Sequence, residues 1–148
     1  MGDERSMRIL PVFLAAVIGG CAAVPATGPV PEPGPGPAAR TENFAVASLL
    51  DGARADAAAG RLASAAASLE RALRIEPRNP RLWQELARVR LKQGDYAQAE
   101  NIAARSNSWA GDDSGLRAEN WRLIAQARDA RGDAAGARAA LETAERQR

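Results

Sequence analysis

The chain has 148 residues, a formal net charge of +2, and a hydrophobic content of 46%, of which little is aromatic. Because the net charge is small and the acidic and basic residues are interleaved, the composition gives no support for nucleic-acid binding and favours solvated helix faces. With one cysteine and no histidine, the chain has no second thiol for an internal disulfide and lacks the usual base for a cysteine nucleophile.

The N-terminal 20 residues have the pattern of a secretory signal peptide. Two arginines come first, an apolar stretch of about ten residues follows over residues 9–18, and two glycines then precede Cys21. This stretch is well below the ~20 residues that cross a bilayer, so we expect a cleaved signal over residues 1–20. Translation could begin at Met1 or at Met7, and both starts keep the apolar stretch.

The tetrapeptide Ile-Gly-Gly-Cys that ends at Cys21 resembles the lipobox of bacterial lipoproteins. The resemblance implies cleavage before Cys21 and acyl chains on its sulfur and its new amino group, which together anchor the protein in a membrane. Ala22 follows where an aspartate would favour the inner membrane, so the resemblance implies the outer membrane, with the protein facing the periplasm of a Gram-negative bacterium. An ordinary signal peptide with an incidental cysteine is the alternative.

Residues 21–43 are predicted to be a disordered linker that carries the anchored cysteine. Proline and glycine recur from Val24 to Ala39; proline removes backbone donors and favours polyproline II, and glycine loosens the chain. As a flexible coil, a linker of about 20 residues has an average end-to-end distance of roughly 25 Å. We therefore expect a spacer between the membrane and a folded domain over residues 44–148.

The predicted domain contains an internal helix–turn–helix repeat. Three glycines between predicted helices lie 34 and 38 residues apart, and each is followed five residues later by an alanine. The two sets are Gly60, Gly94 and Gly132, and Ala65, Ala99 and Ala137. A period of 34 with small residues at fixed places is typical of the tetratricopeptide repeat. We predict an all-α fold of three repeats, over about 46–79, 80–117 and 118–148, whose six antiparallel helices form a short right-handed solenoid.

Local residues support the helix boundaries. Asn79 can cap a helix that begins at Pro80, and Asp133 can cap a later helix. Asp95, with Gln98 three residues on, resembles a capping box. The helices are therefore predicted from their end signals as well as from the repeat.

The segment SNSWAGDDSG, between the second and third repeats, is predicted to be a loop that carries four added residues. Its Asp112, Asp113 and Ser114 suit caps and turns, and two adjacent carboxylates without further ligands make a poor metal site. Trp109 in this loop is a candidate binding anchor, and packing back over the repeat junction is the alternative.

No residue pattern in the chain predicts catalysis. There is no histidine, no glycine-rich phosphate loop and no nucleophile motif, and Lys92 is the only lysine. We therefore expect no enzyme activity, no cofactor, no metal and no small-molecule substrate. Binding to a protein partner is the default function for a repeat solenoid.

The predicted binding surface is a groove formed by the first helix of each repeat. Helical spacing places almost no acidic side chains in this groove. The basic and amide side chains that it places there are Arg54, Arg81, Gln84, Arg88, Lys92, Arg122 and Gln126. The guanidinium groups in such a groove could bind the carboxylates of an acidic peptide through bidentate hydrogen bonds. Ordinary solvated charges are the alternative, and the outer face and the edge near Trp109 are the other candidate surfaces.

A closer resemblance lies in the stretch SLERALRIEPRNPRLWQELARVRLKQGDYAQAENIAARSN. It resembles the small tetratricopeptide lipoproteins of gammaproteobacteria, which include the LpoP-type activators of class A penicillin-binding proteins. The resemblance covers the anchor, the linker and residues 44–148, and it implies an outer-membrane lipoprotein that docks on such a synthase and stimulates peptidoglycan synthesis. A tetratricopeptide pilotin for a secretin, or another envelope assembly scaffold, is the alternative, although pilotins of that kind have more repeats.

Overall fold

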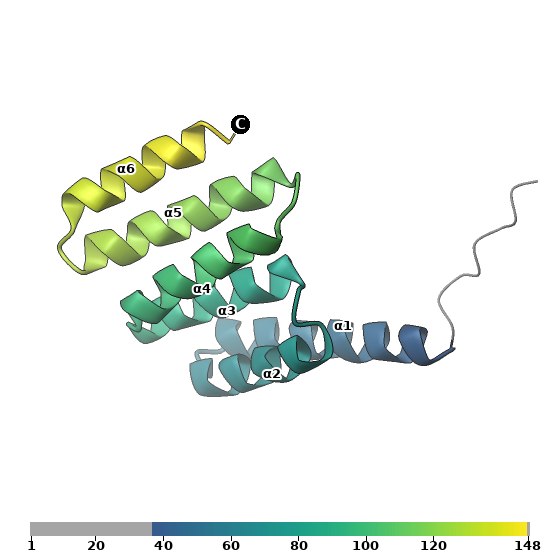
Figure 1. Ribbon diagram of the computed structural model, residues 1–148. Helices are drawn as coiled ribbons and strands as arrows, with labels where there is room; N and C mark the ends of the chain where they lie inside the picture. The colour runs from purple at the N-terminus through teal and green to yellow at the C-terminus, as the bar shows by residue number, and fades with distance from the viewer. Residues whose placement is uncertain (1–36, 148) are drawn as a thin grey trace, which may run out of the picture. The chain divides into compact units, whose positions relative to one another are not determined.

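Six α-helices make up the part of the chain that the structure describes. The computed structural model describes the backbone of residues 37–147 and the side chains from Asn43 onward. The helices are α1 (Pro37–Ala58), α2 (Leu62–Ile75), α3 (Pro80–Gln93), α4 (Tyr96–Trp109), α5 (Ser114–Ala130) and α6 (Ala134–Glu145). They form three helix–turn–helix pairs, and each pair packs on the next in chain order (Figure 1). The predicted all-α fold of three repeats is therefore confirmed.

Several helices begin where a side chain can satisfy their first backbone N–H groups. The Asn79 side chain accepts a hydrogen bond from the N–H of Arg81 at 3.0 Å, and Pro80 occupies the first turn of α3. Asp133 caps α6, because its carboxylate accepts from the N–H of Gly136 at 2.8 Å. Both predicted caps are confirmed.

The predicted capping box at the start of α4 is wrong. Asp95 makes no side-chain cap hydrogen bond, and its carboxylate lies 3.8 Å from the guanidinium of Arg90 near the end of α3. Gly94 adopts φ +83°, and the Asp95 N–H then donates to the Arg90 carbonyl at 2.9 Å. The Asp95 side chain therefore lies towards the end of α3, while the Asp95 carbonyl accepts from the N–H of Ala99 at 2.9 Å in the first turn of α4.

The four added residues of the third repeat lie in α5, so the prediction that they belong to a loop is wrong. α3 begins 14 residues before Gly94, whereas α5 begins 18 residues before Gly132. The capping residues Asn79 and Asp113 keep the 34-residue spacing, so the connection before α5 is no longer than the one before α3. One extra helical turn at the start of α5 absorbs the addition.

α1 begins at Pro37, inside the range 21–43 that we predicted as linker. Proline suits a first helical position, and the two alanines that follow it favour helix. The predicted signal peptide, Cys21 and most of the predicted linker lie outside the described residues. Within residues 37–147, no helix is both long and apolar enough to cross a bilayer.

Alanines and a few larger aliphatic residues fill the interfaces between helices. The predicted small residues Ala65 and Ala99 are fully buried, and Ala137 is nearly so, which lets paired helices approach closely. Leu69 and Leu82 are buried at the junction of the first two pairs. α3 contacts α5 as well as α4, so the first helices of the second and third repeats are direct neighbours.

Candidate functional site

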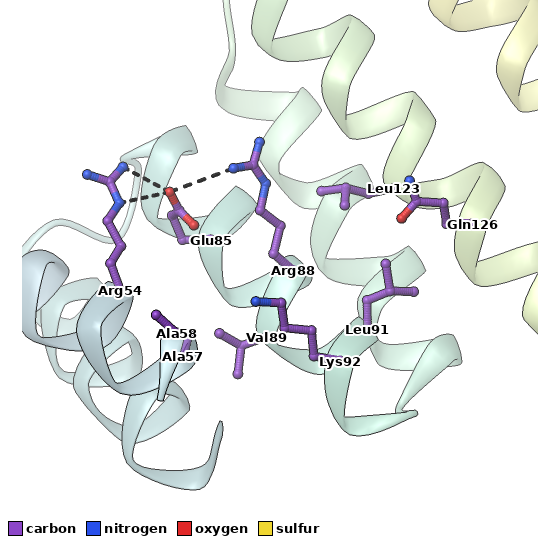
Figure 2. A pocket seen from close by; sticks show the side chains of 10 residues that line it. All are labelled: Arg54, Ala57, Ala58, Glu85, Arg88, Val89, Leu91, Lys92, Leu123 and Gln126. Carbon is purple, nitrogen blue, oxygen red and sulfur yellow. Dashed lines mark hydrogen bonds and ion pairs between the residues drawn. The ribbon is translucent and has the colours of Figure 1, made fainter. Parts of the chain in front are cut away.

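A hollow of about 460 Å³ is lined by residues of α1, α3 and α5, the first helices of the three repeats. Arg54, Arg88 and Gln126 hold equivalent positions in the three repeats, 34 and 38 residues apart, and all three side chains line it (Figure 2). The rest of its lining is Glu85, Lys92 and the apolar residues Ala57, Ala58, Val89, Leu91 and Leu123. We call this hollow the inner groove.

Acidic side chains lie in and beside the inner groove, so the prediction that it is almost free of them is wrong. Glu85 accepts hydrogen bonds from Arg54 Nη2 at 2.8 Å and Nε at 3.1 Å, and it lies 3.9 Å from Arg88 Nη1. Arg88 pairs in turn with Glu119 of α5 at 2.6 Å. A row of alternating charges therefore joins α1, α3 and α5 and orients the two arginines.

Positive charge still exceeds negative charge in the lining of the inner groove. Arg54, Arg88 and Lys92 stand against the single carboxylate of Glu85. The Arg54 side chain is 54% exposed, and Lys92 forms no ion pair with any other residue that the structure describes. Cations above an apolar floor suit a segment that carries both carboxylates and aliphatic side chains.

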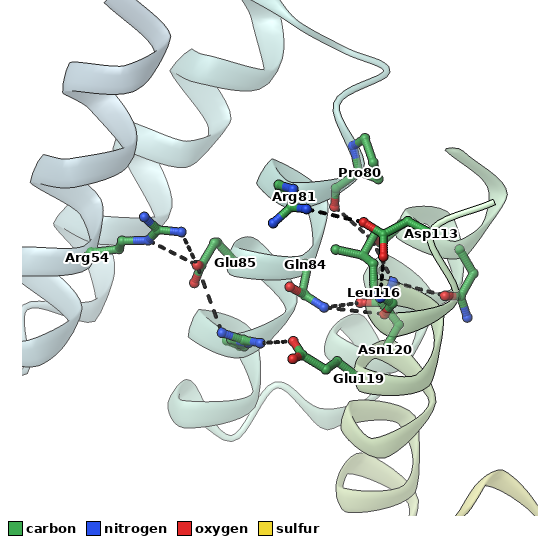
Figure 3. Close-up of polar contacts among 12 residues, drawn as sticks. Arg54, Pro80, Arg81, Gln84, Glu85, Asp113, Leu116, Glu119 and Asn120 are labelled. Carbon is green, nitrogen blue, oxygen red and sulfur yellow. Dashed lines mark hydrogen bonds and ion pairs between the residues drawn. The ribbon is translucent and has the colours of Figure 1, made fainter. Parts of the chain in front are cut away.

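Gln84 is buried, whereas we predicted that it lies on the surface of the groove. Its side chain is 6% exposed and donates to Asn120 Oδ1 of α5 at 3.0 Å (Figure 3). Asn120 donates to Ser106 Oγ at 2.7 Å, and Ser106 donates to the carbonyl of Pro80 at 2.7 Å. Gln84 thus belongs to a buried network that joins α3, α4 and α5, and it is unavailable to a partner.

Three other predicted binding residues do not line the inner groove. Arg81 pairs with Asp113 at 3.2 Å, and Arg122 is half-buried on α5. Trp109 is the last residue of α4 and not a loop residue. It is 40% exposed, and the Arg78 guanidinium lies over its ring at 5.2 Å. A binding role for these three residues stays a prediction.

Our sequence reasoning missed Glu85 and Glu119. Glu85 and Arg88 are three residues apart on one helix, a spacing that brings side chains together, so a local signal for Glu85 was present. Glu119 faces Arg88 only because α5 packs on α3 in one particular register. No local pattern contains that register.

The chemistry that these side chains offer is ionic and apolar contact. The described residues contain no group of three or more cysteine, aspartate or glutamate side chains placed to hold a metal ion. The carboxylate of Glu85 is already engaged by Arg54. The inner groove is therefore best described as a candidate binding surface.

Comparisons with known proteins agree with the repeat fold and also give one similar solved structure. A family model described as tetratricopeptide repeat matches residues 56–119. The solved structure of the globular C-terminal domain of LpoP from P. aeruginosa is 51% identical in sequence, with a TM-score of 0.67. That match covers 68% of this chain and 94% of the LpoP domain. A comparison with curated proteins gave no match.

Proposed function

The chain belongs to the family of tetratricopeptide-repeat proteins that includes LpoP, and on this premise we propose that it binds and stimulates a class A penicillin-binding protein in peptidoglycan synthesis. The observation that carries the proposal is the 51% identity over 94% of the LpoP domain. The fold supports binding rather than catalysis, because repeat solenoids offer extended surfaces to protein partners. We propose no enzyme activity and no cofactor.

The proposal includes an anchor in the outer membrane, with the helical domain in the periplasm. Its support is the lipobox-like sequence that ends at Cys21, where acyl chains would hold the protein on the membrane. The proline- and glycine-rich residues before α1 would then act as the spacer. From there the domain would reach towards a synthase in the inner membrane.

The inner groove is the surface that we propose for the contact with the synthase. Its excess of cations favours an acidic segment, and its apolar floor favours aliphatic side chains on the same segment. Binding can raise the activity of the synthase only if the groove has a higher affinity for the active conformation than for the inactive one.

The test is glycan-strand polymerisation by the cell's own class A penicillin-binding protein, with and without the purified protein. We expect a rise of several-fold with the unmodified protein. Lys92→Glu reverses one charge of the inner groove without breaking an ion pair between described residues. It should weaken binding about fivefold, or about 1 kcal/mol, at concentrations below saturation.

Arg138→Glu is the matched control, because it makes the same change of charge on an exposed position of α6. It should leave the stimulation unchanged. Stimulation that survives both Lys92→Glu and Arg88→Glu would move the contact to another face. No stimulation and no complex with the unmodified protein would contradict the proposed function itself.

A further inference from the structure

A second hollow, of about 470 Å³, lies between α2 and α4 and uses a different face of α3 from the inner groove. α3 contributes Trp83, Leu86 and Arg90 to it, whereas Glu85 and Lys92 of the same helix line the inner groove. α2 and α4 both pack on α3 and form the two walls. We call this second site the outer hollow.

Uncompensated positive charge lies on both walls of the outer hollow. Arg74 comes from α2 and Arg105 from α4, and neither forms an ion pair with another residue of the described range. The Arg105 guanidinium stacks over the Trp83 ring at 4.5 Å, which leaves its N–H edges free. Glu70 is the one acidic residue of the lining, and Arg90 Nη2 already binds it at 2.7 Å.

Arg90 adds a buried donor that has no acceptor. Its Nε is buried and has no hydrogen-bond partner in the part of the chain that the structure describes. The equivalent residue of the third repeat, Arg128, donates from its Nε to Glu100 at 2.8 Å. A buried donor without a partner is destabilising, because it has lost its hydrogen bonds to water and gained none in the protein. Arg90 therefore lacks at Nε the carboxylate partner that Arg128 has in the third repeat.

We propose that the outer hollow binds an acidic segment of a protein partner, in which an apolar side chain lies between carboxylates. The apolar side chain would contact Trp83 and Ile102, and the carboxylates would accept hydrogen bonds from Arg74 and Arg105 on the two walls. The inference rests on the proposed function only for the identity of the partner, which would be the class A synthase.

The first test needs no synthase. The probe is a short capped peptide with one leucine flanked by two glutamates on each side, and its control carries glutamine in place of each glutamate. The Trp83 indole N–H donates to the Pro77 carbonyl at 2.8 Å, so its NMR signal reports on this hollow, while Trp121 of α5 reports on the third repeat. We expect the glutamate peptide to shift the Trp83 signal and to leave that of Trp121 in place.

The second test measures the affinity of the purified protein for the synthase. Arg74→Glu with Arg105→Glu should weaken it roughly tenfold, because two attractive contacts become repulsive. Arg71→Glu with Arg138→Glu makes the same total change of charge at exposed positions outside the outer hollow, and should change the affinity less than twofold. All four arginines are exposed, so the fold should survive, and circular dichroism checks this.

The outcomes separate this inference from the proposed function. The inference is supported if the glutamate peptide shifts the Trp83 signal and the glutamine peptide does not, and if Arg74→Glu with Arg105→Glu lowers the affinity for the synthase roughly tenfold. No shift of Trp83, or equal shifts with both peptides, overturns it whether or not the synthase is stimulated. Equal affinity of both double variants for the synthase overturns the assignment of the outer hollow to that partner, while the stimulation by the unmodified protein still tests the function.

Discussion

At the scale of single residues, the neighbours of a polar side chain decide whether a partner can use it. Arg54 is held by Glu85, which is 17% exposed, whereas Lys92 in the same groove has no described ion partner. Gln84 is on the same helix as Lys92, and its side chain donates to the buried Asn120. Three residues that were all predicted to bind a partner therefore differ: Arg54 is oriented by an ion pair, Lys92 has no described ion partner, and Gln84 has a structural role.

The buried amide network should be the most sensitive polar feature of the protein. Asn120 is fully buried, accepts from Gln84, and donates to Ser106 and Asn107. Asn120→Ala leaves these partners unsatisfied and opens a cavity, so it should lower the free energy of unfolding by about 2–4 kcal/mol. Urea denaturation measures the loss.

Gln126→Ala is the control for this substitution, since it removes an exposed amide of the same helix. It should change the free energy of unfolding by less than about 0.5 kcal/mol. An Asn120→Ala variant as stable as the control would show that the network does not hold α3, α4 and α5 together.

At the scale of helices and turns, backbone conformation sets where each element ends. Gly94 ends α3 with φ +83°, and Gly60 and Gly132 adopt similar positive values at the other two turns within the pairs. In this region of the backbone a Cβ atom is strained, so glycine is favoured there. Gly52 differs, because it lies within α1 and has no atom within 4 Å of where a Cβ would be.

Substituting alanine at these two glycines should have opposite effects. Gly94→Ala should lower the free energy of unfolding by about 1 kcal/mol or more, because alanine disfavours the left-handed conformation. Gly52→Ala should raise it by about 0.5–1 kcal/mol, because alanine favours helix and meets no steric contact there. Thermal denaturation compares the two, and a melting temperature that moves in the same direction for both would contradict this account.

At the scale of the whole described domain, stacking three repeats brings charges from separate helices into one surface. The inner groove joins cations of α1 and α3 with apolar side chains of α1, α3 and α5. The outer hollow joins α2, α3 and α4 in the same way on another face of α3. The two surfaces lie on different faces of α3, and both carry cations. One long acidic segment of a partner, or two separate acidic segments, could therefore bind to both.

If these surfaces bind the synthase as proposed, the affinity should depend on salt. Raising the ionic strength from about 0.05 M to about 0.3 M shortens the Debye length to below 10 Å and should weaken the complex several-fold. The dependence should be shallower for Lys92→Glu than for the unmodified protein, because one cation of the groove is lost. Titrations at several salt concentrations measure both slopes, and an affinity that is independent of salt would contradict a charge-based contact.

Much of the fold was predictable from local patterns, because the signals lie within a few residues of the feature that they specify. Asn79 with Pro80, and Asp133, marked helix starts that the structure confirms. The glycines 34 and 38 residues apart marked the turns within the pairs. The site was less predictable: the groove and the equivalent positions of Arg54, Arg88 and Gln126 followed from the repeat, but the acidic residues beside them did not.

Helix periodicity, capping residues and the recurring glycines were enough to predict the all-α class and the three repeats, because each of these signals can be found along the chain itself. The family followed from the resemblance of the repeat sequence to known lipoproteins. Three features became visible only once the helices were packed: the four added residues extend α5, Gln84 is buried against Asn120, and Glu119 pairs with Arg88. Each of these depends on how one helix packs on another. A shift of one residue in that packing would bring a different set of side chains into contact, and no local pattern encodes which set it is.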